Sequence, residues 1–249
     1  MTYQELKPSK KLAHIIDSYW FFSSEDNLEN EKVLPDGCMD IIFNFGSLTN
    51  TIAPNEIAVT GMMTTYSSKS FERNTELLGV RFKTGMFSEI SSFPLFEIKD
   101  ATTEASIVIP EFNIETMERL KEQASITQRL KLIEKLLLKI ITSKNTSNDN
   151  LIPSVIKFIQ NSSASTPIEK IAKHHCISLR QLERKFKYQV GVTAKEFERI
   201  ARFQKTKKLI RTEINSSLLD IALYAGYFDH SHLSNEFKRL SGESPSEFR

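Results

Sequence analysis

Apolar and polar residues alternate in the first part of the chain and recur with helical spacing in the remainder. After a Pro-Asp-Gly turn signal at 35–37, residues 39–45 carry apolar side chains at every second position, and residues 77–83 repeat the alternation. Shorter apolar runs at 17–22 and 57–63 predict further strands. Regular turn signals between such short strands favour a small barrel or sandwich.

From about residue 111 the apolar period becomes helical. Within 126–141 the apolar residues are spaced 4, 3, 4, 3, namely Ile126, Leu130, Ile133, Leu137 and Ile140. This is the seam of a coiled coil over about two heptads. It allows two interpretations, which are pairing with a second copy of the chain and packing of the helix on its own barrel.

The last third of the chain contains one pattern twice, in residues 168–197 and 218–248. Identical residues recur 50 positions apart before the turn and 51 after it: Ile171 and Ile221, Ala172 and Ala222, Leu182 and Leu233, Phe186 and Phe237, Lys187 and Lys238, Gly191 and Gly242, Phe197 and Phe248. A repeated unit of this size is one supersecondary element used twice. Each copy has the signals of helix, short turn and helix, the arrangement that places a second helix in a DNA major groove.

A polar stretch, SKNTSNDN at 143–150, is the predicted linker. It divides the chain into a sensor or dimerisation domain, 1–142, and a DNA-binding domain, 151–249. The expected fold class is α+β. A small β-barrel-like N-terminal domain with following helices is joined to an all-α C-terminal domain, in which a long helix connects two helix-turn-helix units.

The second helix of each copy carries the candidate DNA contacts, because its remaining positions point outward once the apolar ones pack. These residues are Arg180, Gln181, Glu183, Arg184 and Lys187 in the first copy and His230, Ser231, Ser234, Asn235 and Lys238 in the second. Arg pairs with guanine, Asn with adenine, and Glu accepts from cytosine, whereas the two later lysines suit phosphates. The stronger charges of the first copy predict that it carries more of the base specificity, while the second copy fixes the register.

Charge is distributed unevenly although the net charge is only +2. Residues 151–249 hold 17 basic and 10 acidic side chains, which gives +7, and residues 1–150 hold 16 and 21, which gives −5. A basic C-terminal part indicates a polyanionic partner.

Two cysteines, Cys38 and Cys176, lie far apart and suggest no disulfide framework, as in a reducing cytoplasm. The apolar runs are too short for a transmembrane helix, and the N-terminus lacks the apolar core of a signal peptide. We therefore expect a cytoplasmic protein without a membrane partner.

Metal and catalytic sites are not expected. The consecutive residues His174, His175 and Cys176 diverge at a helix end, so a structural turn is favoured over a metal site. The N-terminal domain has only His14, which excludes a multi-histidine site there. The chain has no phosphate-binding loop and no nucleophile elbow, so we expect no cofactor and no catalytic residue.

Three polar residues on apolar strands are candidate ligand contacts: Asp40, Asn44 and Arg81. A cavity beneath these faces would let them orient a small polar ligand. The alternative is that they face solvent, with Asp40 paired to Arg81.

Residues from about 155 to 249 resemble the DNA-binding domain of the AraC/XylS family of bacterial transcription regulators. The resemblance rests on the segments DIALYAGYFDHSHLSNEFKRLSGESPSEFR and ISLRQLERKFKYQVG and on Arg202 in the connecting helix. It implies two helix-turn-helix units with both second helices in successive major grooves on one DNA face. Asn235 departs from the family's frequent Arg, which changes what the second copy contacts, while Leu233 and Thr206 are packing variants. The segments YWFF, VLPDGCMDIIFNFG and LLGVRFKTG are similar to the sensor portion of one branch of the family.

These observations predict a sequence-specific DNA-binding transcription regulator, controlled by a small molecule or by assembly through the N-terminal domain. The expected partners are promoter DNA, RNA polymerase, a small-molecule effector and a second copy of the chain. Two other classes stay open. One is an enzyme with its site in the N-terminal barrel, and the other is a helical adaptor that binds protein and has no DNA affinity.

Overall fold

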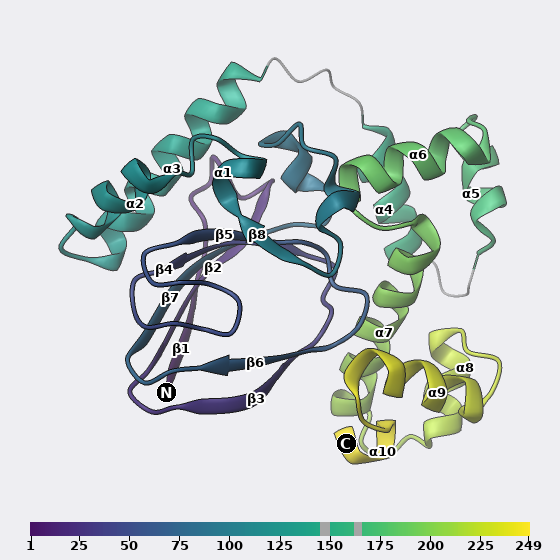
Figure 1. Ribbon diagram of the computed structural model, residues 1–249. Coiled ribbons are helices and arrows are strands. Elements are labelled where there is room, and N and C mark those ends of the chain that lie inside the picture. Colours follow the sequence, from purple (N-terminus) through teal and green to yellow (C-terminus); the bar gives the residue numbers. More distant parts are fainter. Residues whose placement is uncertain (145–149, 162–165) are drawn as a thin grey trace.

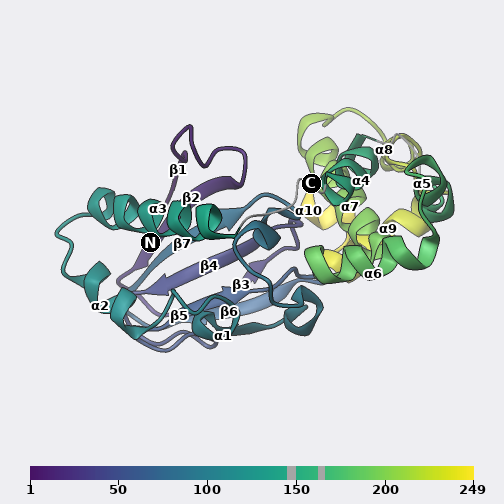
Figure 2. The same ribbon diagram turned by 90° about the horizontal axis from the view of Figure 1, so that it is seen from above.

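A computed structural model describes residues 1–144, 150–161 and 166–249. A β-rich N-terminal part and a helical C-terminal part lie side by side, with the helices α4–α10 gathered beyond one end of the strands (Figures 1 and 2). The predicted α+β class is confirmed. Among the residues described, no helix is both long and apolar enough to cross a lipid bilayer.

A six-stranded antiparallel sheet forms the centre of the N-terminal part, in the order β1-β2-β7-β4-β5-β8. Its strands are β1 (Thr2–Leu6), β2 (Ile16–Ser24), β4 (Met39–Asn44), β5 (Ile57–Thr60), β7 (Thr75–Phe82) and β8 (Thr102–Glu104). A second sheet pairs β3 (Leu28–Val33) with β6 (Ser67–Phe71). All four predicted strand segments are strands, and the register of β4 against β7 sets Asp40 opposite Arg81.

The alternation along β4 and β7 gives the large sheet two different faces. Met39, Ile41 and Phe43 are buried in the main core, as are Leu78, Val80 and Phe82 of β7, the residues that share the predicted face. The opposite face carries Trp20 and Leu77, which cluster with Phe71 of the small sheet. Gly79 allows the Trp20 indole to lie flat on this face, because a Cβ at that position would stand 1.9 Å from the ring.

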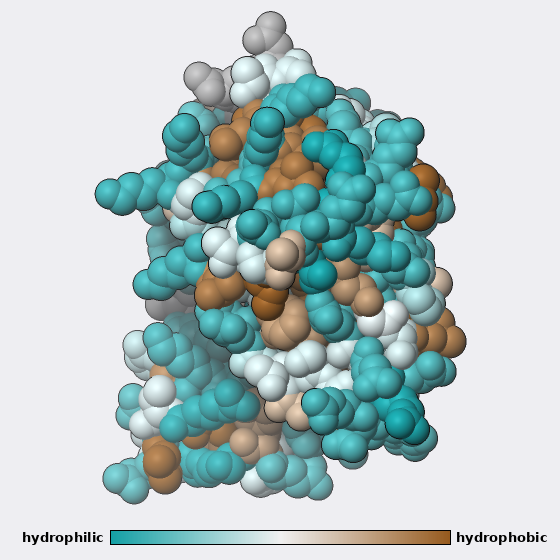
Figure 3. All heavy atoms as spheres, turned by 90° about the vertical axis from the view of Figure 1, so that its left-hand side faces the viewer, coloured by the Kyte–Doolittle hydropathy of each residue, from teal (hydrophilic) through white to brown (hydrophobic). Residues whose placement is uncertain are grey.

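Helical segments cover the face of the large sheet that carries Met39, Ile41 and Phe43. They are the 3₁₀ helices η1 (Met86–Glu89) and η2 (Leu95–Ile98) and the α-helices α1 (Ala105–Val108), α2 (Ile114–Lys121) and α3 (Ile126–Ser143). On α3, Ile133, Leu137 and Ile140 of the predicted seam are buried in the core of their own chain. Packing of this helix on its own domain is therefore confirmed, and the seam is not free for a second copy. Figure 3 views this side of the molecule, where apolar side chains gather among polar ones in the upper half.

The C-terminal part consists of helices with well-formed ends. They are α4 (Leu151–Asn161), α5 (Ile168–His174), α6 (Leu179–Val190), α7 (Ala194–Thr212), α8 (Leu218–Ala225), α9 (His230–Ser241) and α10 (Pro245–Phe248). Gly191 and Gly242 end α6 and α9 with φ of 92° and 77°, the left-handed conformation that glycine adopts without strain. The predicted linker lies largely outside the described residues.

The two helix-turn-helix units belong to different hydrophobic cores. Leu182 and Phe186 of α6 are buried in the same cluster as the N-terminal sheet, which extends through α4 and the start of α7. Leu233 and Phe237 of α9 belong to a separate cluster with Phe203 of α7. The first unit is therefore built into the N-terminal part, whereas the second has a core of its own.

Candidate nucleic-acid interface

The first unit pairs α5 with α6, and its second helix begins at a complete capping box. The Ser178 hydroxyl accepts from the Gln181 backbone N–H at 3.2 Å, and the Gln181 side chain accepts from the Ser178 N–H at 3.2 Å. Because Leu182 and Phe186 face the core, Arg180, Arg184 and Lys187 stand on the exposed side of α6. Gln181 is also exposed, but its side chain is engaged in the cap.

The second unit pairs α8 with α9. The Asp229 carboxylate accepts from the His232 backbone N–H at 2.7 Å and caps α9. Leu233 and Phe237 are buried, which turns His230, Ser231, Asn235 and Lys238 to solvent.

All ten predicted contact residues thus lie on α6 or α9. Glu183 and Ser234 are half-buried and the other eight are exposed. Burial raises the pKa of Glu183 above its usual range. The contact of this carboxylate with DNA stays a prediction, as do the DNA contacts of the other nine side chains.

A buried ionic cluster holds α9 against the long helix α7, and the sequence patterns did not reveal it. Glu236 of α9 is 6% exposed and lies 3.2 Å from the Arg199 guanidinium and 3.5 Å from that of Arg202. Arg202 also pairs with Glu198 at 3.1 Å and donates to the Gly226 carbonyl at 3.2 Å. The cluster therefore connects α7 to α9 and to the turn before it. Only the opposite charges at 198 and 202, four residues apart, signalled part of it.

Both second helices also touch the N-terminal part. The Tyr188 hydroxyl of α6 donates to the Ser92 carbonyl at 2.6 Å. At the end of α9 the Thr65 hydroxyl donates to the Arg239 carbonyl at 3.0 Å, and the Tyr66 ring lies where a Cβ on Gly242 would approach it to 2.7 Å. These contacts tie the orientation of α6 and α9 to the N-terminal part.

Between the start of α7 and the N-terminal part, Lys99 and Glu196 form an ion pair at 2.6 Å. Burial raises the pKa of Glu196, but hydrogen bonds from Lys99 and Thr193 outweigh it and hold that pKa below its usual range. The carboxylate is therefore ionised at neutral pH and keeps its charge in this pair.

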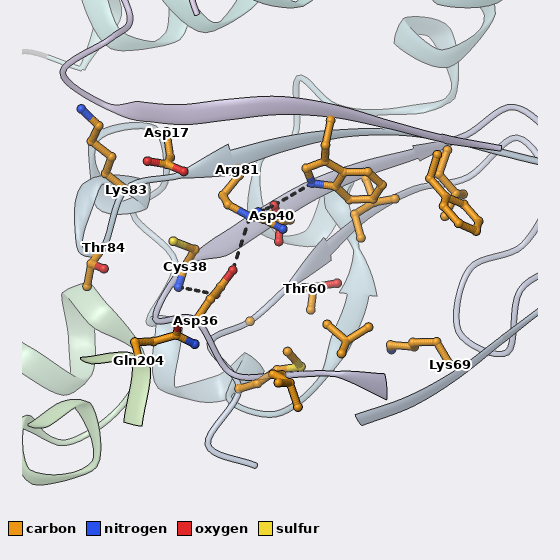
Figure 4. Close-up of a pocket in the computed structure, with 18 of the residues that line it drawn as sticks. Asp17, Asp36, Cys38, Asp40, Thr60, Lys69, Arg81, Lys83, Thr84 and Gln204 are labelled. Atoms are coloured by element: carbon orange, nitrogen blue, oxygen red, sulfur yellow. Dashed lines mark hydrogen bonds and ion pairs between the residues drawn. The ribbon is translucent and has the colours of Figure 1, made fainter. Parts of the chain in front are cut away.

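A cavity of about 1420 Å³ opens between the two sheets and reaches the C-terminal helices. Its apolar end is lined by Trp20, Phe22, Ile42, Phe71 and Leu77. Its polar end is lined by Asp36, Asp40 and Arg81 together with Gln204 of α7 (Figure 4). Lys207 of α7 also lines the cavity. The cavity wall therefore includes residues of both parts of the chain.

The polar end is a compact group of charges around Arg81. The Arg81 Nε lies 3.5 Å from Asp40 and 3.4 Å from Asp36, and the Trp20 indole donates to Asp40 at 3.0 Å. Burial raises the pKa of Asp40 to about 6, although Arg81 acts in the opposite direction. Burial also raises the pKa of the Cys38 thiol, which keeps it protonated and unreactive. The face that carries Asp40 and Arg81 lines a cavity, and the two residues are also paired.

The structure places Asn44 elsewhere. It is completely buried, and its amide donates to the carbonyls of Ser47, Ile52 and Ala53 while its oxygen accepts from the Gly46 N–H. It does not line the cavity. The alternation placed Asn44 on the cavity side of β4, but the strand ends there and the side chain closes the following loop instead.

No group of three metal-ligating side chains occurs within residues 1–144, 150–161 and 166–249. The His174 and His175 rings pack edge to face at 5.1 Å, and His174 also lies 5.1 Å from the Phe158 ring. Cys176 has a left-handed φ of 55° in the turn that follows. These neighbours form a turn at the end of α5.

Two protein-family models match this chain. Residues 171–249 match a helix-turn-helix domain, and residues 4–104 match a domain of unknown function, DUF6597. The first match contains α6 and α9, and the second contains both sheets.

Curated relatives match up to about half of this chain. The arabinose operon regulatory protein of Escherichia coli strain K12 is 29% identical over 126 residues, which are 48% of this chain and 43% of that protein. The HTH-type transcriptional activator RhaS of Escherichia coli O139:H28 is 35% identical over 81 residues, 32% of this chain and 29% of that protein. The matches thus span less than half the length of each relative.

Among solved structures, ToxT from Vibrio cholerae aligns with 100% of this chain and 98% of its own, at 12% identity and a TM-score of 0.49. Values this low carry neither function nor ligand from ToxT to this chain.

Proposed function

The C-terminal domain of this chain belongs to the AraC/XylS family of bacterial transcription regulators, and on that basis we propose that the protein is a sequence-specific DNA-binding transcription regulator. One observation carries the proposal. The second helix of each unit, α6 or α9, has a capped start and exposes polar and basic side chains on the side opposite its buried residues. Such helices insert their first turns into the major groove.

The spacing of the two units suits successive grooves. The connecting helix α7 has 19 residues, which at 1.5 Å each gives about 28 Å. Adjacent turns of the major groove on one DNA face lie about 34 Å apart. In the proposed complex Arg180 and Arg184 contact bases, and Lys187 and Lys238 contact phosphates.

We assign more of the base specificity to the first unit. Its exposed set contains Arg180 and Arg184, whose guanidinium groups form bidentate hydrogen bonds with guanine. The second unit presents His230, Ser231 and Asn235, none of which carries a guanidinium group. Its proposed role is to fix the register of the complex.

A small-molecule effector is proposed to occupy the cavity and to contact Asp40 and Arg81. The polar end suits a ligand with hydrogen-bond donors, and the apolar end suits its hydrocarbon or aromatic portion. Because Gln204 and Lys207 of α7 line the same cavity, an occupant touches the helix that joins the two units. Occupancy would shift the arrangement of α6 and α9 to the extent that the effector binds one arrangement better than another.

Other proposed partners follow from the relatives. RhaS carries the name of an activator, so contact with RNA polymerase is proposed here as well. The buried seam of α3 directs any self-association to another surface. We propose no enzymatic activity, since these relatives are regulators.

Binding selection from a random DNA pool, followed by salt titration on the selected site, tests the proposal. For six to ten phosphate contacts, the binding constant should fall by about 10³- to 10⁵-fold between roughly 50 and 200 mM salt. Arg184→Ala should lose the discrimination between bases at one position of the site, which a bidentate contact supplies at about 1–3 kcal/mol. The matched control is Arg119→Ala on the exposed side of α2, which should leave both affinity and preference unchanged. Absence of a selected sequence, or binding that ignores salt, would refute the function.

A further inference from the structure

Phe228 is the most exposed large apolar side chain among the described residues, at 86%. It lies in the turn between α8 and α9, directly before the capping residue Asp229. Leaving a phenylalanine in water forgoes the favourable free energy of its burial, so the fold itself gains nothing from this side chain.

The repeat makes the orientation of Phe228 more unusual. The residue at the same place in the first unit is Ile177, directly before Ser178, and it packs against the main core. An apolar residue at this place ordinarily packs against the fourth helical residue as a hydrophobic staple, which here would be Leu233. Phe228 instead points into solvent, and the buried cluster around Leu233 is completed by Tyr227.

The backbone that presents Phe228 is held in place. The Phe228 N–H donates to the His232 Nδ1 at 3.3 Å, and the His232 N–H donates to Asp229 at 2.7 Å. The His232 ring packs edge to face on buried Tyr227 at 5.3 Å. The turn is thus fixed by both side-chain and ring contacts, and the exposed ring projects from a defined position.

We infer that Phe228 is a base-reading residue that packs on the methyl group of a thymine in the half-site of α9. The inference rests on the proposed function. The first turn of a major-groove helix lies closest to the base edges, and Phe228 adjoins His230 and Ser231 of that turn. The thymine methyl is the apolar group that base pairs present in the major groove, and phenylalanine is among the side chains that contact it.

Burial of one methyl group sets the expected size of the effect. Replacing the contacted thymine by deoxyuracil removes that methyl and should weaken binding by about fourfold. The remaining contacts of α9 are polar and involve other atoms of the bases, so the effect should be confined to one thymine.

The experiment uses the full-length protein and its selected DNA site. Each thymine in the half-site of α9 is replaced in turn by deoxyuracil, and affinities are compared for the unaltered protein, Phe228→Ala and Phe228→Leu. We expect a loss of about fourfold at one thymine for the unaltered protein, no methyl effect at that position for Phe228→Ala, and partial recovery for Phe228→Leu. Tyr224→Ala, at a 67% exposed aromatic of α8, is the matched control and should keep the full methyl effect.

The outcomes separate this inference from the proposed function. Specific, salt-dependent binding with no thymine methyl that depends on Phe228 overturns the inference and leaves the function standing. A Phe228→Ala variant with unchanged DNA preference but weakened transcription would assign the ring to a protein partner, which also overturns it. Absence of specific binding by the unaltered protein overturns both. Thermal unfolding of each variant checks that the exposed substitution leaves the fold intact.

Discussion

Replacing Asp40 by Asn should stabilise the protein at neutral pH. The carboxyl of Asp40 sits at the polar end of the cavity with a pKa raised from 3.8 to about 6, because burial outweighs the attraction of Arg81. One pKa unit corresponds to about 1.4 kcal/mol, so ionising this group costs the folded protein ~3 kcal/mol. Asn has nearly the same shape and keeps an acceptor for the Trp20 indole, but it carries no charge.

The pH dependence follows from the sign of this pKa change. Below about pH 3 Asp40 is protonated in both the folded and unfolded states, and its contribution to stability is complete. Between about pH 4 and 6 the unfolded chain releases the proton first, so this contribution is lost as the pH rises through the folded pKa. The Asp40→Asn variant has no carboxyl at this position, so its stability shows no such loss as the pH rises. The difference in unfolding free energy should therefore be near zero at about pH 3 and grow to ~3 kcal/mol at about pH 7.

Urea unfolding at a series of pH values measures this difference. Glu25→Gln, at an exposed carboxylate between β2 and β3, is the control, because it removes one negative charge without altering the cavity. A variant that is less stable than the unaltered protein at pH 7 would refute the reasoning, because it would show that the ion pair with Arg81 outweighs the cost of burial.

Three other substitutions test the packing. Asn44→Ala should destabilise by several kcal/mol, because three loop carbonyls lose their donor; urea unfolding measures it, and a loss under 1 kcal/mol would contradict that role. Phe237→Ala should cost about 3–5 kcal/mol and abolish binding to the half-site of α9, while leaving near-ultraviolet circular dichroism from Trp20 unchanged. Gly242→Ala should lower the melting temperature for two reasons, the left-handed φ of 77° and the clash of the new Cβ with the Tyr66 ring. Adding Tyr66→Ala removes the clash and should recover only part of the loss. Full recovery would show that backbone strain contributes nothing.

Local sequence patterns were sufficient to predict the helices and strands, but not the contacts that these elements make with one another. The alternation around Asp40 and Arg81 identified their common face, and the repeated apolar positions, such as Leu182 and Leu233, located α6 and α9. Each of these signals lies within a few residues of sequence, and the physics that produces it is equally local.

Other features depend on residues far apart in the sequence. Trp20 and Asp36 complete the group around Arg81, and Gln204 enters the same cavity from α7. Glu236 reads as one more polar helical residue until the packing of α9 on α7 buries it. Asn44 fits the strand period but lies at the strand's last position, where loop closure determines its contacts. These arrangements are set by tertiary packing, which no periodicity encodes.

The shared core of the first helix-turn-helix unit and the N-terminal sheet has a consequence for truncation and local opening. Because Leu182 and Phe186 share the core of the sheet, we expect α6 to open only with the global free energy of the main cooperative unit. The second unit has a small core of its own, and Phe203 and Phe237 can separate from each other while the sheet stays intact. Hydrogen exchange should therefore be faster in α9 than in α6. A fragment cut at residue 150 would carry one self-sufficient copy of the repeat and one whose apolar surface has lost its covering.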